Sequence, residues 1–189
     1  MKPMHKEEKR RLSKTISHAL RHAPHLYELE LDDHGWTPVD HLIDGLHHHR
    51  KAWRTVDLET IEEIVKTDSK GRYELDLKTS KIRALYGHST TSKLIKEAAT
   101  PPEILFHGTS PATAKLIMEQ GLRPMSRQFV HHSVDTATAK EVGHRKDGKP
   151  VLLHVHAHKA HLAGITFYKG NALIWLSDPV PPEFISLAP

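Results

Sequence analysis

Apolar residues recur at helical spacing in the first stretch of the chain, over residues 6–22. Leu12, Ile16 and Leu20 stand four residues apart, which places them on one face of a helix. Pro24 follows directly, and a proline cannot continue a helix interior. The pattern therefore predicts an amphipathic helix that ends just before Pro24.

A second face of this helix is basic. Lys14, His18, Arg21 and His22 lie at positions i, i+4, i+7 and i+8, so they share that face. Cations near a helix C-terminus complement the helix dipole, and this is the simpler interpretation. The planar fork of an arginine also suits phosphate, and a histidine can donate or move a proton. This stretch alone favours the dipole interpretation, and the motifs further along the chain change that preference.

The next residues predict a short strand and two more helices. Leu29–Asp32 alternates apolar and acidic residues, as in a strand. Thr37 and Pro38 resemble an N-cap followed by proline at the first helical position, so a helix should follow. A third apolar stripe covers residues 58–65, with Asp57 as its cap.

A hairpin follows the three helices. Residues 73–77 and 82–86 alternate apolar and polar side chains, and a short polar turn separates them. Three helices and a hairpin form the element order of a winged helix. The third helix carries Glu59, Glu62 and Glu63, which would repel a phosphate backbone. Arg21, His22 and the hairpin are therefore better candidates for nucleic-acid contact.

Residues 87–102 have the composition of a connector, with small polar residues first and two prolines last. A short helix is expected over residues 93–98. We place the lobe boundary near residue 100, which gives lobes of residues 1–100 and 101–189.

The second lobe is rich in short apolar runs. Strands are predicted at residues 104–106, 129–133, 151–155, 165–168, 172–175 and 184–187. Two short helices begin after the cap residues Ser110 and Asp135. The fold class is therefore α+β, with a winged-helix lobe and a compact β-rich lobe.

Composition narrows the class of protein further. The 189 residues are 38% hydrophobic and 26% charged, with a formal charge of +4. No apolar run approaches the length of a membrane span, and the charged N-terminus has no signal-peptide core. No cysteine is present, so disulfides and thiol chemistry are excluded. A cytoplasmic protein with no membrane partner fits these features, and a monomer is expected.

Motifs for metals and for two common nucleotide folds are missing. The 18 histidines include His47, His48 and His49, but consecutive residues of a helix cannot all reach one ion. No HExxH, GxGxxG or GxxxxGK[ST] pattern occurs, so we expect neither a metal, nor a Rossmann site, nor a P-loop.

Four motifs in order resemble the RNA 2′-phosphotransferases of the KptA type. They are Leu20-Arg21-His22-Ala23-Pro24, residues 82–89 (IRALYGHS), His107-Gly108-Thr109 and residues 126–133 (SRQFVHHS). The resemblance continues through residues 141–145 (EVGHR) and 171–176 (NALIWL), so it covers nearly the whole chain.

The resemblance implies an activity and a cosubstrate. Members of that family transfer an internal 2′-phosphate of RNA to NAD+, which yields 2′-hydroxyl RNA, nicotinamide and ADP-ribose 1″,2″-cyclic phosphate. The N-terminal lobe would then be an RNA-binding winged helix, and the C-terminal lobe an ADP-ribosyltransferase-like NAD-binding fold. A spliced tRNA is one possible substrate. No metal is required.

The resemblance also assigns residues. The catalytic set falls on Arg21, His22, Arg83 and Arg127. The resemblance implies NAD-binding positions at His107, Gly108, Thr109, Ser133 and Arg145, and Ser110, His132 and Asn171 are further candidates for the same site. Lys14, His18 and His88 are candidate contacts to RNA phosphates.

Residue chemistry agrees with those roles. A phosphomonoester is largely a dianion at neutral pH and needs no strong base to attack a ribose carbon. Charge then builds around phosphorus, where cationic donors help most. A glycine at 108 would let the backbone approach a ligand closely, and Thr109 and Ser110 lie where a helix start favours phosphate. Asn171 fits a turn equally well.

Two positions depart from the family pattern, and two other functions are open. His132 stands where the family usually has an apolar residue, and residues 171–176 have Ala172 in place of a common glycine, with one extra residue. The alternatives are an ADP-ribosyltransferase that caps nucleic-acid phosphates, and a winged-helix nucleic-acid binder without catalysis. A stable ADP-ribosylated end product would indicate the first, and a failure to consume NAD+ the second.

Overall fold

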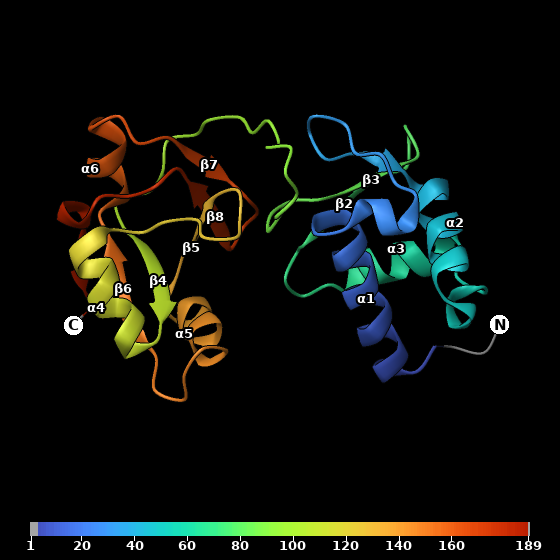
Figure 1. The fold of residues 1–189 in the computed structure, drawn as a ribbon, viewed down its shortest axis with the longest axis horizontal. Helices are drawn as coiled ribbons and strands as arrows, with labels where there is room; N and C mark the ends of the chain where they lie inside the picture. Colours follow the sequence, from blue (N-terminus) through green and yellow to red (C-terminus); the bar gives the residue numbers. More distant parts are fainter. Residues whose placement is uncertain (1–3, 189) are drawn as a thin grey trace. The chain divides into compact units, whose positions relative to one another are not determined.

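The computed structural model describes residues 4–188, and within them it contains six α-helices and two antiparallel sheets (Figure 1). Contacts divide the chain into two compact units. The first ends at Ile95, and the second begins at Lys96. Both units combine helices with antiparallel strands, so the chain is a mixed α/β protein. None of the helices in this range is both long and apolar enough to cross a bilayer.

The first unit packs three helices against a small sheet. The helices are α1 (Lys6–Arg21), α2 (Val39–His49) and α3 (Leu58–Thr67). The strands are β1 (Thr37–Pro38), β2 (Tyr73–Asp76) and β3 (Lys81–Ala84), in the order β1-β3-β2. Short 3-10 helices cover Pro24–Tyr27 and Lys51–Trp53.

The predicted apolar stripe of α1 is confirmed. Leu12, Ile16 and Leu20 have no exposed surface and belong to one core with residues of α2, α3 and the sheet. The predicted third helix is also confirmed, since the Asp57 carboxylate accepts a 2.9 Å hydrogen bond from the Thr60 amide at its start. The hairpin of β2 and β3 lies where the alternation predicts it.

Two predictions in this unit are wrong. The stretch Leu29–Asp32 forms no strand, because the Leu29 and Asp32 amides bond locally to Pro24 and Trp36 carbonyls. Thr37 does not cap α2. It pairs with Ile82 in β1, and the Val39 amide at the helix start donates to Ser80 in the hairpin turn. Local backbone bonds thus occupy the amides of Leu29 and Asp32, whereas distant partners in the sheet and the hairpin turn replace the expected cap at Thr37.

The predicted helix over residues 93–98 is also absent. The Ile95 amide bonds to the Asp33 carbonyl of the first unit, whereas Ala98 forms a bridge with Tyr168 of the second unit. The buried side chain of Leu94 anchors the same stretch. Backbone hydrogen bonds to each unit therefore hold the connector in an extended form.

The second unit is built on a six-stranded sheet. Its strands are β4 (Leu105–Thr109), β5 (Val130–Ser133), β6 (Val151–Val155), β7 (Phe167–Lys169), β8 (Ile174–Ser177) and β9 (Ile185–Leu187). They lie in the order β7-β8-β5-β4-β6-β9, and every pair is antiparallel. The helices are α4 (Pro111–Gln120), α5 (Thr136–His144) and α6 (Ala157–Leu162).

Helices cover both faces of this sheet. On one face, Leu105 and Leu153 share a core with Ile117 of α4 and Ala160 of α6. On the other face, α5 lies directly against Gly108, where a Cβ atom would come within 1.9 Å of the Ala139 carbonyl oxygen. Glycine is therefore required at 108 so that α5 can pack on β4.

The capped helices of this unit are confirmed, and one helix was not predicted. Ser110 and Asp135 each accept a hydrogen bond from the amide three residues later, at the starts of α4 and α5. The third helix, α6, has only six residues, and its buried alanines give a weak apolar stripe. The sequence therefore predicts two helices where the unit has three.

Candidate active site

Arg21 and His22 lie together where α1 ends. The Arg21 side chain is buried, and its guanidinium carbon lies 4.9 Å from the centre of the Tyr86 ring and 5.9 Å from that of Tyr73. His22 is the C-cap of the helix, and its Nδ1 is 2.8 Å from Ser89 Oγ. The Ser89 amide also donates to the Arg21 carbonyl at 2.9 Å. Ser89 thus fixes the end of α1 and the orientation of the imidazole.

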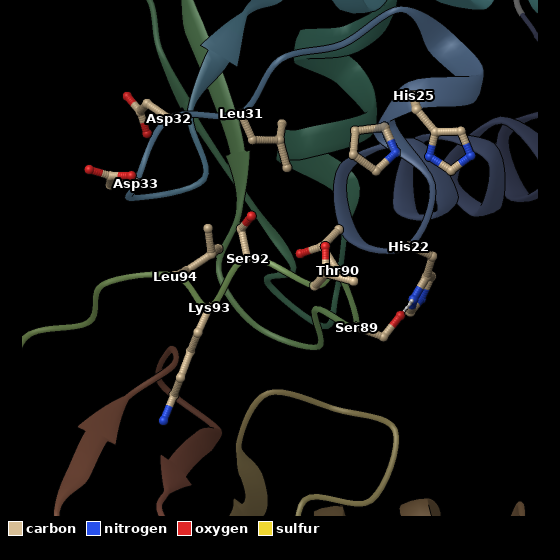
Figure 2. A pocket seen from close by; sticks show the side chains of 12 residues that line it. His22, His25, Leu31, Asp32, Asp33, Ser89, Thr90, Ser92, Lys93 and Leu94 are labelled. Atoms are coloured by element: carbon tan, nitrogen blue, oxygen red, sulfur yellow. Dashed lines mark hydrogen bonds between the residues drawn. The ribbon is translucent and has the colours of Figure 1, made fainter.

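A cavity opens beside His22 within the first unit. Its volume is about 420 Å³, within the usual range for small-ligand sites. Figure 2 shows His22 and Ser89 at one side, with Leu31 and Thr90 nearer the middle. Pro24, His25, Asp32, Asp33, Thr91, Ser92, Lys93 and Leu94 complete the lining. The cavity next to the predicted catalytic histidine is therefore lined by both apolar side chains and several hydroxyl groups.

Arg83 lies on the central strand of the small sheet, on the face opposite to Tyr73 and Ala84. The register fixes this orientation, because it pairs Tyr73 with Ala84 and Glu74 with Arg83, and successive side chains of a strand point to opposite faces. The Arg83 Nε and Nη2 atoms lie 2.8 and 2.6 Å from Glu74 Oε2. Its guanidinium carbon lies 4.4 Å from the centre of the Trp36 ring.

The three candidate RNA-phosphate residues differ in exposure. Lys14 is exposed on α1. His18 is also exposed, its Nδ1 lies 3.1 Å from the Tyr27 hydroxyl, and its ring centre is 6.2 Å from that of His22. His88 is only 3% exposed, so its ring offers little surface to an external phosphate. The helix face is therefore the more accessible of these positions.

In the second unit, His107 and Thr109 lie on β4 next to β5. His107 Nδ1 is 3.0 Å from the His131 carbonyl oxygen. A carbonyl can only accept, so Nδ1 carries the hydrogen and Nε2 of the neutral ring is an acceptor. Burial lowers the pKa of His107, which favours this neutral form. Thr109 is buried at the end of β4, and Ser110 caps α4.

His132 and Ser133 are buried on β5. His132 Nε2 lies 2.8 Å from Ser177 Oγ, whose hydroxyl donates to the Asp178 carbonyl at 2.7 Å. The His132 ring therefore donates from Nε2. Burial, together with the neighbouring His107 and His131, holds the pKa of His132 well below its ordinary value. With 1% exposure, His132 is part of the core of this unit.

The remaining predicted positions lie on loops and helix ends. Arg127 precedes β5 on an exposed loop, and its amide donates to the Pro124 carbonyl. Arg145 is exposed after α5 and pairs with Glu141 at 3.3 Å. The Asn171 side-chain oxygen accepts from two amides of its own turn, at residues 173 and 174, which is the turn role that the sequence left open.

Within each unit, the structure brings part of the predicted set together. Arg21 and His22 are adjacent. Tyr73, whose ring contacts Arg21, lies on one face of the hairpin, and Arg83 projects from the other face. In the second unit, His107 lies beside residues 131–133, and Gly108 faces α5 and not an open space. The NAD contacts of these residues stay predictions.

Sequence reasoning missed three residues that position the candidate catalytic groups. Ser89 holds His22, while Glu74 and Trp36 hold Arg83. Ser89 is the last residue of the motif at residues 82–89, so its place in that motif was a usable signal. Glu74 and Trp36 gave none, because their contacts depend on the pairing of three strands. Residues 4–188 contain no group of metal-binding side chains close enough to hold an ion.

The candidate site in the first unit thus combines a buried arginine and a histidine with a cavity that several hydroxyl side chains line. The sequence profile described as RNA 2′-phosphotransferase, Tpt1 / KptA family, matches residues 7–179. A probable RNA 2′-phosphotransferase of Bacillus thuringiensis subsp. konkukian is 49% identical over 176 residues, which are 93% of this chain and 94% of that protein. One from Acetivibrio thermocellus is 47% identical over 175 residues, with the same coverage of both chains.

The chain therefore belongs to the RNA 2′-phosphotransferase family, as the four motifs predicted. The family profile spans both units, so it includes the Arg21 site as well as the β4 and β5 strands.

Proposed function

We propose that this protein removes an internal 2′-phosphate from RNA and transfers it to NAD+. The observation that carries the proposal is the Arg21-His22 pair at the end of α1, held by Ser89 beside a cavity, in a chain of this family. The first unit would act as an RNA-binding winged helix. The second would act as an ADP-ribosyltransferase-like unit that binds NAD+ through residues of β4 and β5.

The reaction would run in two steps. First, an oxygen of the RNA 2′-phosphate attacks the ribose carbon that bears nicotinamide, and the carbon–nitrogen bond breaks with release of nicotinamide. Second, the adjacent ribose hydroxyl loses its proton and attacks phosphorus, and the bond from phosphorus to the RNA 2′-oxygen breaks. That oxygen takes up a proton, which leaves 2′-hydroxyl RNA and ADP-ribose 1″,2″-cyclic phosphate.

The cationic residues would act on the transferred phosphoryl group. Arg21, Arg83 and Arg127 would neutralise the charge that builds on its oxygens during the second step. A buried guanidinium stacked on aromatic rings, as at Arg21, is already desolvated and oriented, so it loses little on binding an anion. His22 would exchange a proton through Nε2, because Nδ1 faces Ser89.

In the second unit, a neutral His107 would present Nε2 as an acceptor to a hydroxyl of the dinucleotide. The amide groups at the start of α4, next to Thr109 and Ser110, would favour its phosphates. The cavity beside His22 would receive the nucleotide that carries the 2′-phosphate, with its hydroxyls toward ribose and its apolar wall toward the base.

The test is incubation with an oligoribonucleotide that carries one internal 2′-phosphate, with and without NAD+. We expect loss of the 2′-phosphate only with NAD+, with ATP unable to replace it and EDTA without effect. Activity that ATP supports, or that EDTA abolishes, would refute the proposal. A stable ADP-ribosylated RNA as the end product would instead identify a transferase that stops after the first step.

A further inference from the structure

We propose that Glu74 is a positioning residue for Arg83, and that with Trp36 it sets the orientation in which the guanidinium meets the RNA 2′-phosphate. This inference rests on the proposed function. Glu74 is directly opposite Arg83 in the pairing of β2 and β3. On the other side of β3, Thr37 pairs with Ile82, so Trp36 is the next residue along and lies beside Arg83.

Glu74 engages one defined edge of the guanidinium. Nε and Nη2 of Arg83 both lie within hydrogen-bond distance of the same oxygen, Glu74 Oε2, at 2.8 and 2.6 Å. The Trp36 ring meets the guanidinium carbon at 4.4 Å, a distance typical of stacking. Glu74 thus binds one edge of the Arg83 guanidinium, and Trp36 stacks on its plane. The other edge, formed by Nη1 and Nη2, is left to bind a phosphate.

Trp36 is itself held by the loop that precedes it. The Asp32 carboxylate accepts from the Trp36 amide at 2.9 Å and from the His34 amide at 3.0 Å. Gly35 between them has a positive φ of 82°, and a Cβ there would meet Leu94 at 2.9 Å. Asp32 and Leu94 also line the cavity beside His22. The loop that orients Trp36 is therefore part of that cavity wall.

Charge and stability do not account for this arrangement. A carboxylate beside a phosphate-binding arginine opposes an incoming anion, so its charge alone would weaken binding. The Arg83 and Glu74 side chains are 25% and 45% exposed, and ion pairs at such exposure contribute little to stability. Arginine is a long side chain that loses much rotamer freedom when it is fixed. We therefore attribute the Glu74 contact to the orientation of Arg83 before the substrate binds.

The test is a double-mutant cycle on turnover of the 2′-phosphorylated oligonucleotide. We expect Glu74→Ala to lower kcat roughly tenfold, the factor that corresponds to the rotamer freedom of one long side chain. Glu74→Gln keeps an acceptor oxygen and should recover most of the rate. In the Arg83→Ala background, Glu74→Ala should have no further effect, because Glu74 acts only through Arg83.

A matched control comes from the same unit. Lys9 and Glu63 form another exposed ion pair, so Glu63→Ala removes a carboxylate of similar setting and should leave turnover unchanged. Thermal unfolding of each variant excludes loss of fold, and if Glu74→Ala unfolds, Glu74→Leu, which also lacks an acceptor oxygen, replaces it in the cycle. The inference is overturned if Glu74→Ala lowers kcat in the Arg83→Ala background as much as it does in the wild-type protein. It is also overturned if Glu74→Gln is as slow as Glu74→Ala, or if turnover is faster without the carboxylate. If the wild-type protein does not turn over the 2′-phosphorylated oligonucleotide, the proposed function itself is refuted.

Discussion

Replacement of Arg83 by alanine separates catalysis from stability. In the fold, Arg83 makes a half-exposed ion pair with Glu74 and a stacking contact with Trp36. Such an ion pair contributes about 0–1 kcal/mol and such a stacking contact about 0.5–1 kcal/mol. Arg83→Ala should therefore lower the free energy of unfolding by only about 0.5–2 kcal/mol. Chemical denaturation of the variant measures this value.

The effect on the reaction should be larger. Loss of one oriented donor at a developing anion costs about 3–4 kcal/mol, which is a rate decrease on the order of a hundredfold to a thousandfold. Arg83→Lys should recover only part of this, because an ammonium cannot make the planar two-point contact. The second step builds more charge at phosphorus, so Arg83→Ala should accumulate RNA with an ADP-ribosylated 2′-phosphate.

Rapid quenching followed by separation of the labelled RNA species measures both steps. Near-normal turnover of Arg83→Ala would make Arg83 an ordinary surface arginine of the strand. A slow variant without the ADP-ribosylated intermediate would keep Arg83 in the site but refute its assignment to the second step.

Three further predictions concern positions elsewhere in the fold. Gly108→Ala places a Cβ atom 1.9 Å from the Ala139 carbonyl oxygen, so thermal unfolding should show that the free energy of unfolding falls by about 3 kcal/mol or more. Gly148 has open space around it, so Gly148→Ala should change that free energy little. Because the pKa of His132 is depressed in the fold, the unfolded chain takes up a proton first as pH falls below about 6.5, so stability to urea should fall between pH 7.5 and about 5. His132→Leu should make that decline shallower, and an unchanged slope would contradict the assignment. Ser89→Ala removes the hydrogen bond to His22 and should lower kcat about fivefold without change in the unfolding temperature. An unaltered kcat would show that this bond has no role in catalysis.

Local signals predicted those elements whose hydrogen bonds are local. The helices α3, α4 and α5 begin at Asp57, Ser110 and Asp135, whose side chains accept from amides three residues later. Such caps depend only on neighbouring residues, so the sequence contains the whole signal. The alternation of apolar and polar residues likewise predicted the hairpin of β2 and β3.

Some elements that depend on distant partners were not predicted correctly. Thr37 has the chemistry of a cap but pairs with Ile82. The connector near Leu94 suits a helix by composition, yet its amides bond to residues far away in sequence. A single sequence does not contain the pairing that decides these cases.

The same limit applies to the candidate site. Residue types and motif order identified Arg21, His22 and Arg83, and the first two are adjacent in the fold. Their partners were not identified, because Glu74 meets Arg83 only through the register of two strands. Gly108 was expected to admit a ligand, whereas its missing side chain admits the backbone of α5. A glycine in a motif does not reveal which backbone approaches it.

The most direct test of the proposed reaction follows the phosphorus atom itself. An oligoribonucleotide labelled with ³²P only at its internal 2′-phosphate is incubated with the protein and NAD+, and nicotinamide release is measured in the same sample. We predict that the label leaves the RNA and appears in ADP-ribose 1″,2″-cyclic phosphate, in equal amount to the nicotinamide released. Label released as inorganic phosphate, or retained on RNA while nicotinamide is produced, would contradict the account.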